Sequence, residues 1–171
     1  MRNHSFAARN GIFGLLVGLG FIAAALIFYK TGQGISLNPG LNNAILLLSI
    51  VGAFIGVRKY REEELGGYIS FGKAFGGCIY IIGVGTLVYG MYIYYMYGKH
   101  PELQEQYLLM VNTALDEVYK GNPMHDTLKS MMSGLVSPFF VAMAEVFNKI
   151  FTGFIFSLLL AGLLKRRKYV L

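Results

Sequence analysis

The chain has 171 residues, of which 55% are hydrophobic and only 14% are charged, and its formal net charge is +6. The basic residues lie at the ends of long apolar runs, where lipid headgroups are the nearest anions. This distribution excludes a nucleic-acid-binding surface and leaves little chain for a soluble catalytic domain. The single cysteine, Cys78, cannot form an intramolecular disulfide.

Four apolar segments predict membrane-spanning helices, because a bilayer core of about 30 Å requires about 20 apolar residues in a helix. They cover approximately residues 11–29, 41–57, 74–97 and 143–164, and the last apolar run begins near Pro138. The first segment continues through Tyr29, which is longer than the apolar core of a signal peptide. We therefore expect an all-α protein, a polytopic four-helix transmembrane bundle, in a single domain over residues 1–171.

The ends of the second span carry clear helix signals. Asn38 and Pro39 form a cap followed by a first-turn proline. The helix is expected to run past the bilayer to Leu65 and to end at Gly66 and Gly67, as glycine favours helix C-termini. A short connector at the membrane interface then leads into the third span.

The loop of residues 98–137 is the only sizeable polar region. A helix is expected from His100-Pro101 to near Gly121, and a second helical piece is expected after Asn122-Pro123. Apolar residues recur in both pieces at helical spacing, which predicts an amphipathic segment. They comprise Leu103, Tyr107, Met110, Val111, Ala114 and Val118, then Met124, Leu128, Met131, Met132 and Leu135. The segment is expected to pack on the outer membrane surface or on the bundle end; a cap that binds a partner or ligand is the alternative.

The distribution of basic residues predicts the orientation of the chain, because cytoplasmic segments carry the excess of Lys and Arg. The N-terminal tail, the second loop and the C-terminal tail together hold 10 basic residues, whereas the first and third loops hold 4. Both termini are therefore expected in the cytoplasm, with residues 98–137 outside.

The segment from Gly67 to Ala74 matches most of the phosphate-binding motif G-x-x-x-x-G-K-[ST]. Ala74 replaces the hydroxyl residue that holds Mg²⁺, and a charged helix end precedes the segment instead of an apolar strand. Nucleotide hydrolysis is therefore not expected. A plain membrane-entry turn is the simpler interpretation, and contact of Lys73 with one lipid phosphate is the alternative.

Glu145 and Lys149 are the only opposite charges in the last apolar run, and they share one helix face because four residues separate them. Asn148 lies beside them. Ionisable groups inside a membrane suggest a functional site. Helix length places Glu145 close to the outer interface, so a structural interfacial pair is favoured here over a polar site between helices.

Glycine spacing predicts where helices pack closely, since glycine lets two backbones approach each other in lipid. Candidate packing positions are Gly14 and Gly18, Gly52 and Gly56, and the seven-residue series Gly76, Gly83 and Gly90. The series predicts that leucine at Gly83 disturbs packing more than leucine at Gly85. Packing within one bundle is expected, with homodimerisation as the alternative.

The stretch from Arg58 to Phe75 reads RKYREEELGGYISFGKAF: a charged helix end, a Gly-Gly break, and ISFGKAF leading into an apolar span. It resembles the bacterial membrane family called domain of unknown function 4199. The late acidic residue Glu145 and the basic C-terminal end agree with it. The resemblance implies a small four-span protein of the bacterial inner membrane and implies no activity, catalytic residue or cofactor.

No complete catalytic constellation or metal-ligand spacing occurs in the sequence, so no enzyme activity, metal or cofactor is expected. The expected function is a non-enzymatic structural or interaction component of the membrane, surrounded by lipid and joined by a membrane-protein partner or further copies. The alternative is a component of a small-solute or ion transporter or channel that uses Glu145, Asn148 and Lys149. An enzyme acting on lipid would require a buried acid/base pair, for which Glu145 is the only candidate.

Overall fold

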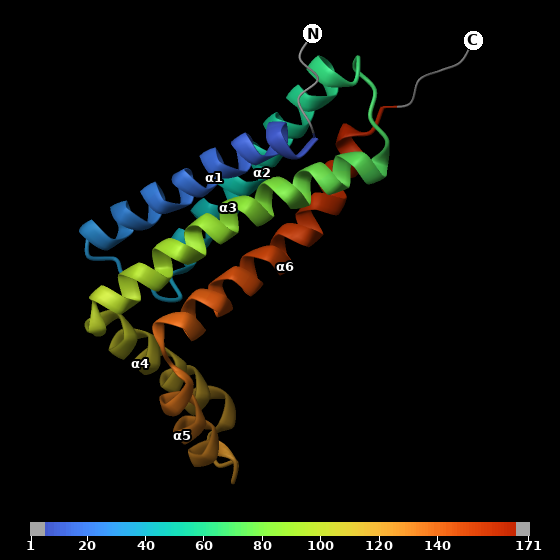
Figure 1. The fold of residues 1–171 in the computed structure, drawn as a ribbon. Helices are drawn as coiled ribbons and strands as arrows, with labels where there is room; N and C mark the ends of the chain where they lie inside the picture. Colours follow the sequence, from blue (N-terminus) through green and yellow to red (C-terminus); the bar gives the residue numbers. More distant parts are fainter. Residues whose placement is uncertain (1–5, 167–171) are drawn as a thin grey trace.

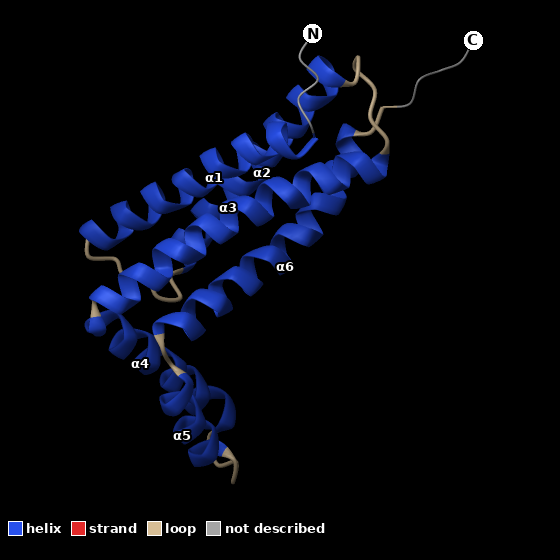
Figure 2. Cartoon of the chain, in the orientation of Figure 1, coloured by secondary structure: helices blue, strands red, loops and turns tan. Residues whose placement is uncertain are grey.

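The computed structural model describes residues 6–166, which form helices joined by short loops, with no β-strand in that range (Figures 1 and 2). The expected all-α class is confirmed. The helices are α1 (Phe6–Lys30), α2 (Pro39–Glu64), α3 (Phe71–Lys99), α4 (Pro101–Tyr119), α5 (His125–Leu135) and α6 (Pro138–Leu164).

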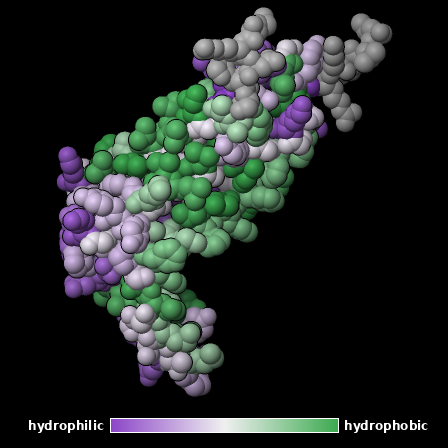
Figure 3. Space-filling view, viewed as in Figure 1, coloured by the Kyte–Doolittle hydropathy of each residue, from purple (hydrophilic) through white to green (hydrophobic). Residues whose placement is uncertain are grey.

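Helices α1, α2, α3 and α6 are each long and apolar enough to cross a membrane, which confirms the four-span bundle and indicates a multi-pass membrane protein. They lie side by side, and their apolar side chains form a broad hydrophobic belt in the space-filling view (Figure 3). The start of α1 and the end of α6 lie at the same end of the bundle, here called the termini end. The opposite end, from which α4 and α5 project, is called the hairpin end.

Helix α3 is the centre of the bundle. Half of its most apolar 18 residues are buried, compared with 28–33% of the corresponding residues in the other spans. It packs on α1, α2 and α6. An added Cβ at Gly14 would lie 3.0 Å from the carbonyl oxygen of Ile81, and one at Gly18 would lie 2.9 Å from that of Gly85. Gly90 of α3 leaves space for a side chain of α6, because an added Cβ there would lie 2.5 Å from Val146 Cγ2.

Helix α2 also uses its glycines for close approach to its neighbours. A Cβ at Gly52 would overlap Val17 of α1, and one at Gly56 would lie 2.6 Å from Ile81 of α3. The two positions therefore set how deeply the side chains of α1 and α3 enter the surface of α2.

The seven-residue series on α3 does not form one packing face. Nothing lies within 4 Å of a Cβ built on Gly83, and Gly76 would only touch the ring edge of Phe6 at 3.9 Å. Gly85 is instead the tight position, with Gly14 O at 3.1 Å and Val17 Cγ1 at 3.0 Å. The expectation that Gly83 is more sensitive than Gly85 is wrong, because α1 contacts a different face of α3.

The helix-end signals of the second span correspond to observed caps. The Asn38 side chain accepts a hydrogen bond from the Leu41 amide at 3.1 Å, and Gly66 and Gly67 follow α2 with φ of 64° and 87°. Ser70 caps α3. Ile69 pairs with Arg166 in an antiparallel bridge. The conspicuous Gly-Gly-x-x-Ser segment therefore turns the chain and holds the end of α6.

Helices α4 and α5 form a hairpin that projects sideways from the end of the bundle (Figure 1). At its root, Leu103 and Tyr107 are buried, and the Tyr107 ring meets the Tyr97 ring edge-on at 6.3 Å. The Tyr97 hydroxyl is hydrogen-bonded to Ser36 at 2.7 Å. The expected amphipathic helical segment between the third and fourth spans is confirmed.

Candidate functional site

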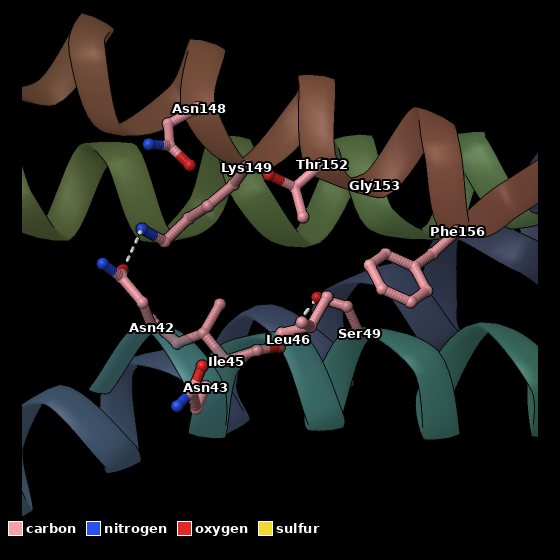
Figure 4. Close-up of a pocket in the computed structure, with 10 residues that line it drawn as sticks. All are labelled: Asn42, Asn43, Ile45, Leu46, Ser49, Asn148, Lys149, Thr152, Gly153 and Phe156. Atoms are coloured by element: carbon pink, nitrogen blue, oxygen red, sulfur yellow. Dashed lines mark hydrogen bonds between the residues drawn. The ribbon is translucent and has the colours of Figure 1, made fainter. Parts of the chain in front are cut away.

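A groove between α2 and α6 brings together the polar side chains of two spans (Figure 4). It encloses about 210 Å³, and α3 runs behind it. Its α2 wall consists of Asn42, Asn43, Ile45, Leu46 and Ser49, and its α6 wall consists of Asn148, Lys149, Thr152, Gly153 and Phe156. The volume is smaller than the roughly 300–1,000 Å³ of pockets for drug-sized ligands, so the groove suits a small molecule or ion.

The charged pair lies at the hairpin-end side of this groove. The Lys149 ammonium contacts the Glu145 carboxylate, and the exposed fractions of the two side chains are 8% and 13%. Lys149 also donates a hydrogen bond to Asn42 Oδ1 at 3.4 Å, as Figure 4 shows. The ammonium lies 5.0 Å from the centroid of the Tyr89 ring, within range of a cation–π interaction. Residues of α2, α3 and α6 therefore surround one cation.

The orientation of the pair agrees better with the alternative of a polar site between helices than with the favoured structural interfacial pair. Helix length alone places Glu145 about 30 Å and Lys149 about 24 Å from Lys165, at about 1.5 Å per residue. Length does not show which way the shared face of the two residues points. In the structure that face meets α2 and α3, so the pair is inside the bundle.

Asn148 is exposed on the groove wall, and its side chain carries no hydrogen bond to a described residue. The same is true of Asn43 on the facing wall. Ser49 differs, because its hydroxyl already donates to the Ile45 carbonyl at 2.8 Å. The amides of Asn43 and Asn148 thus present unused donors and acceptors at the groove.

Sequence reasoning missed three contributors to this site: Asn42, Asn43 and Tyr89. Two adjacent asparagines in the first turns of an apolar span were the available signal, because unpaired amides are costly in lipid. Tyr89 comes from α3; it is only 1% exposed and lies beneath the Lys149 ammonium.

The other sequence candidate, Lys73, lies far from this groove, near the start of α3 at the termini end. Its side chain is exposed and has no hydrogen bond to a described residue, while its amide donates to Ser70 Oγ at 3.4 Å. Contact with a lipid phosphate stays a prediction. Within residues 6–166 no group of three or more His, Cys, Asp and Glu side chains is arranged to hold a metal ion.

Arg61 stabilises the end of α6, a contact that the sequence did not reveal. Its Nη1 donates to the carbonyl oxygen of Leu164 at 2.9 Å and caps the end of α6. Together with the bridge between Ile69 and Arg166, this bond fastens the loop after α2 to α6. Arg61 and Ile69, which make these two contacts, both lie inside the RKYREEELGGYISFGKAF stretch.

Comparison with known proteins agrees with the resemblance seen in that stretch. No curated protein and no solved structure gives a significant match to the chain. A family model described as "Protein of unknown function (DUF4199)" matches residues 12–166, which includes most of α1, the other three spans, the hairpin and the α2–α6 groove. The chain therefore belongs to the DUF4199 family, whose description assigns no molecular function.

Proposed function

We propose that this chain is a non-enzymatic membrane protein whose α2–α6 groove binds a small polar solute or ion, as a component of a transporter or channel. The observation that supports the proposal most strongly is the ion pair of the buried Lys149 and the partly buried Glu145 beside a groove with unused amides. The pair has no net charge, so the site offers both a donor and an acceptor. Asn148 and Asn43 add neutral polar groups for a dehydrated solute.

The cost of burying charges supports a role beyond packing. A buried ion pair often stabilises a protein no more than apolar residues of the same volume would. Ionisable side chains within membrane spans accordingly tend to serve ion or solute pathways. Four spans enclose little volume, so we propose that several copies, or a membrane-protein partner, complete the path.

The second candidate is a structural or interaction component in which the same residues fasten α6 to α2. It is favoured by the hydrogen bond between Lys149 and Asn42, which joins the two helices at 3.4 Å. In that case the ion pair would be needed for stability alone. The two candidates differ in whether a stable variant that lacks both charges still passes ions across a membrane.

The test compares the native chain with E145Q, K149M and the double variant E145Q/K149M. Each single variant should lose about 3–5 kcal/mol of stability, because one buried charge stays unpaired or poorly paired, and the double variant should recover most of that loss. Stability is measured by unfolding in detergent. Proton and potassium flux is then measured in proteoliposomes that carry the native chain or the double variant.

The proposal expects flux with the native chain and none above protein-free vesicles with the double variant. A native chain that passes neither ion, or a double variant that passes them equally well, would contradict the channel and favour the structural candidate. The variant F147L is a matched control, since Phe147 lies on the same helix, is 65% exposed and does not line the groove; its flux should equal that of the native chain.

We also propose that the protein resides in a bacterial inner membrane with both termini in the cytoplasm. The excess of basic residues, 10 against 4, supports this orientation. A cysteine placed at Asn112, in a chain with Cys78 replaced by alanine, should react with an impermeant maleimide added outside intact cells. Labelling only after the cells are opened would indicate the opposite orientation.

A further inference from the structure

One face of α4 stays apolar from the root of the hairpin to its tip. Leu103 and Tyr107 begin this face, and Met110, Ala114 and Val118 continue it at intervals of three and four residues. The exposed fraction rises along it, from 2% at Leu103 and 7% at Tyr107 to 44% at Met110 and 74% at Val118. The face is thus covered at the bundle and uncovered beyond the edge of the bundle.

The opposite face of α4 is polar and is held to α5 by charged groups. Asp116 accepts hydrogen bonds from His125 at 2.6 Å and from Lys129 at 2.6 Å. At about 100° per residue, Asp116 lies nearly opposite the line from Leu103 to Val118. Helix α5 has no fully buried residue, and Met124 just before it and Met131 within it are more than half exposed.

We propose that the apolar face of α4, made of Met110, Ala114 and Val118, rests on the surface of the lipid bilayer at the hairpin end. The root of this face covers the end of the spans, so the uncovered part turns toward the same side, where lipid surrounds the bundle. The lipid-exposed surface of the spans reaches this end at Met91 of α3 and Phe139 of α6, which are 76% and 64% exposed. The proposed surface therefore continues the hydrophobic belt of the spans.

The charges of the hairpin specify how it meets the membrane. The segment 98–137 carries five acidic and three basic residues, so anionic headgroups do not attract it. Amphipathic helices can instead bind by placing apolar side chains at the boundary between headgroups and acyl chains. The hairpin should accordingly bind neutral and anionic bilayers equally well.

The native chain contains no tryptophan, which permits a direct measurement of depth. V118W reports on the proposed lipid face, and L109W is its matched control. Leu109 is 67% exposed on the same helix, but it lies on the polar side. The full chain is reconstituted in phosphatidylcholine vesicles with brominated acyl chains, and quenching is compared with unbrominated vesicles.

We expect about two-fold or more greater quenching of V118W than of L109W, with emission at shorter wavelength, because lipid surrounds only the first indole. The same contrast should persist in vesicles that contain phosphatidylserine. M110W repeats the test on the same face if V118W does not fold, as judged by circular dichroism. Equal quenching of V118W and L109W, or quenching that requires anionic lipid, would overturn the proposal. The proposal would also fail if V118W were not quenched by lipid but its indole became buried as the protein concentration rose, because a second copy would then cover the face.

Discussion

The four-span bundle and the α4–α5 hairpin bury side chains in opposite ways. In the bundle, Gly14, Gly18 and Gly85 let backbones approach to about van der Waals distance, and large apolar side chains point outward. In the hairpin, nothing lies within 4 Å of a Cβ built on Gly134, α5 has no fully buried residue, and charged groups connect the two helices. One region is stabilised by close backbone packing, and the other by exposed ion pairs and an anchored root.

The difference teaches where substitutions should matter. A tightly packed bundle tolerates no added volume at contact positions, since shifting one helix would disturb contacts along its length. Exposed ion pairs lose much of their energy to solvent screening. We therefore expect the bundle to determine whether the chain folds, and the hairpin to respond to conditions such as pH and the presence of lipid.

The largest effect is expected for G85L in the centre of the bundle. The added side chain would meet the backbone of α1, because a Cβ at this position already lies 3.1 Å from Gly14 O and 3.2 Å from the Gly18 amide nitrogen. Backbone atoms cannot rotate away, so we expect a loss of about 3 kcal/mol or more. Thermal unfolding in detergent, followed by circular dichroism, measures it.

G83L is the matched control for this substitution. It lies two residues away on the same helix, and nothing is within 4 Å of its Cβ position. Its melting temperature should equal or slightly exceed that of the native chain, because leucine favours a helix over glycine. If G83L were the more destabilised of the two, the face of α3 that packs on α1 would be assigned wrongly.

The smallest effect is expected in the hairpin, where His125 joins the two helices. Its ring is hydrogen-bonded to Asp126 of α5 and to Asp116 of α4, and these carboxylates raise the pKa of His125 above 6.5, although Lys129 nearby opposes the shift. A raised pKa means that protonated His125 stabilises the hairpin fully below about pH 6.5. That contribution is lost as the pH rises through the raised pKa.

Amide hydrogen exchange in α5, corrected for the intrinsic pH dependence of exchange, checks this prediction. Protection should be greater at pH 5.5 than at pH 8.5 in the native chain, and H125Q should remove the difference. Exchange in α3 should not change between these pH values in either chain. A native hairpin that is better protected at the higher pH would contradict the sign of the effect.

The parts of the fold that were predictable depend on local chemistry. Asn38 caps α2 because its side chain reaches an amide three residues away, and Gly66 and Gly67 end the helix because they adopt positive φ. The amphipathic character of α4 likewise follows from spacing along one helix. None of these features requires knowledge of a neighbouring helix.

The candidate site was predictable only in part. Glu145 and Lys149, with Asn148 beside them, were singled out because charge is rare in an apolar span, but the favoured interpretation was a structural pair at the outer interface. Asn42 and Tyr89 could not be assigned to them, because they come from helices more than 50 residues away in sequence. Which faces meet depends on the rotation of each helix about its own axis.

The sequence by itself determined the number of spans, their approximate ends and the amphipathic hairpin, since these follow from hydrophobic length, capping and periodicity. Only the tertiary structure decided that Gly85 contacts α1 while Gly83 does not, and that Lys149 lies between α2, α3 and α6. The physical reason is the lipid solvent. A helix in lipid is apolar on nearly every face, so hydrophobicity cannot tell its packed face from its lipid-exposed face, and the close approach of backbones decides.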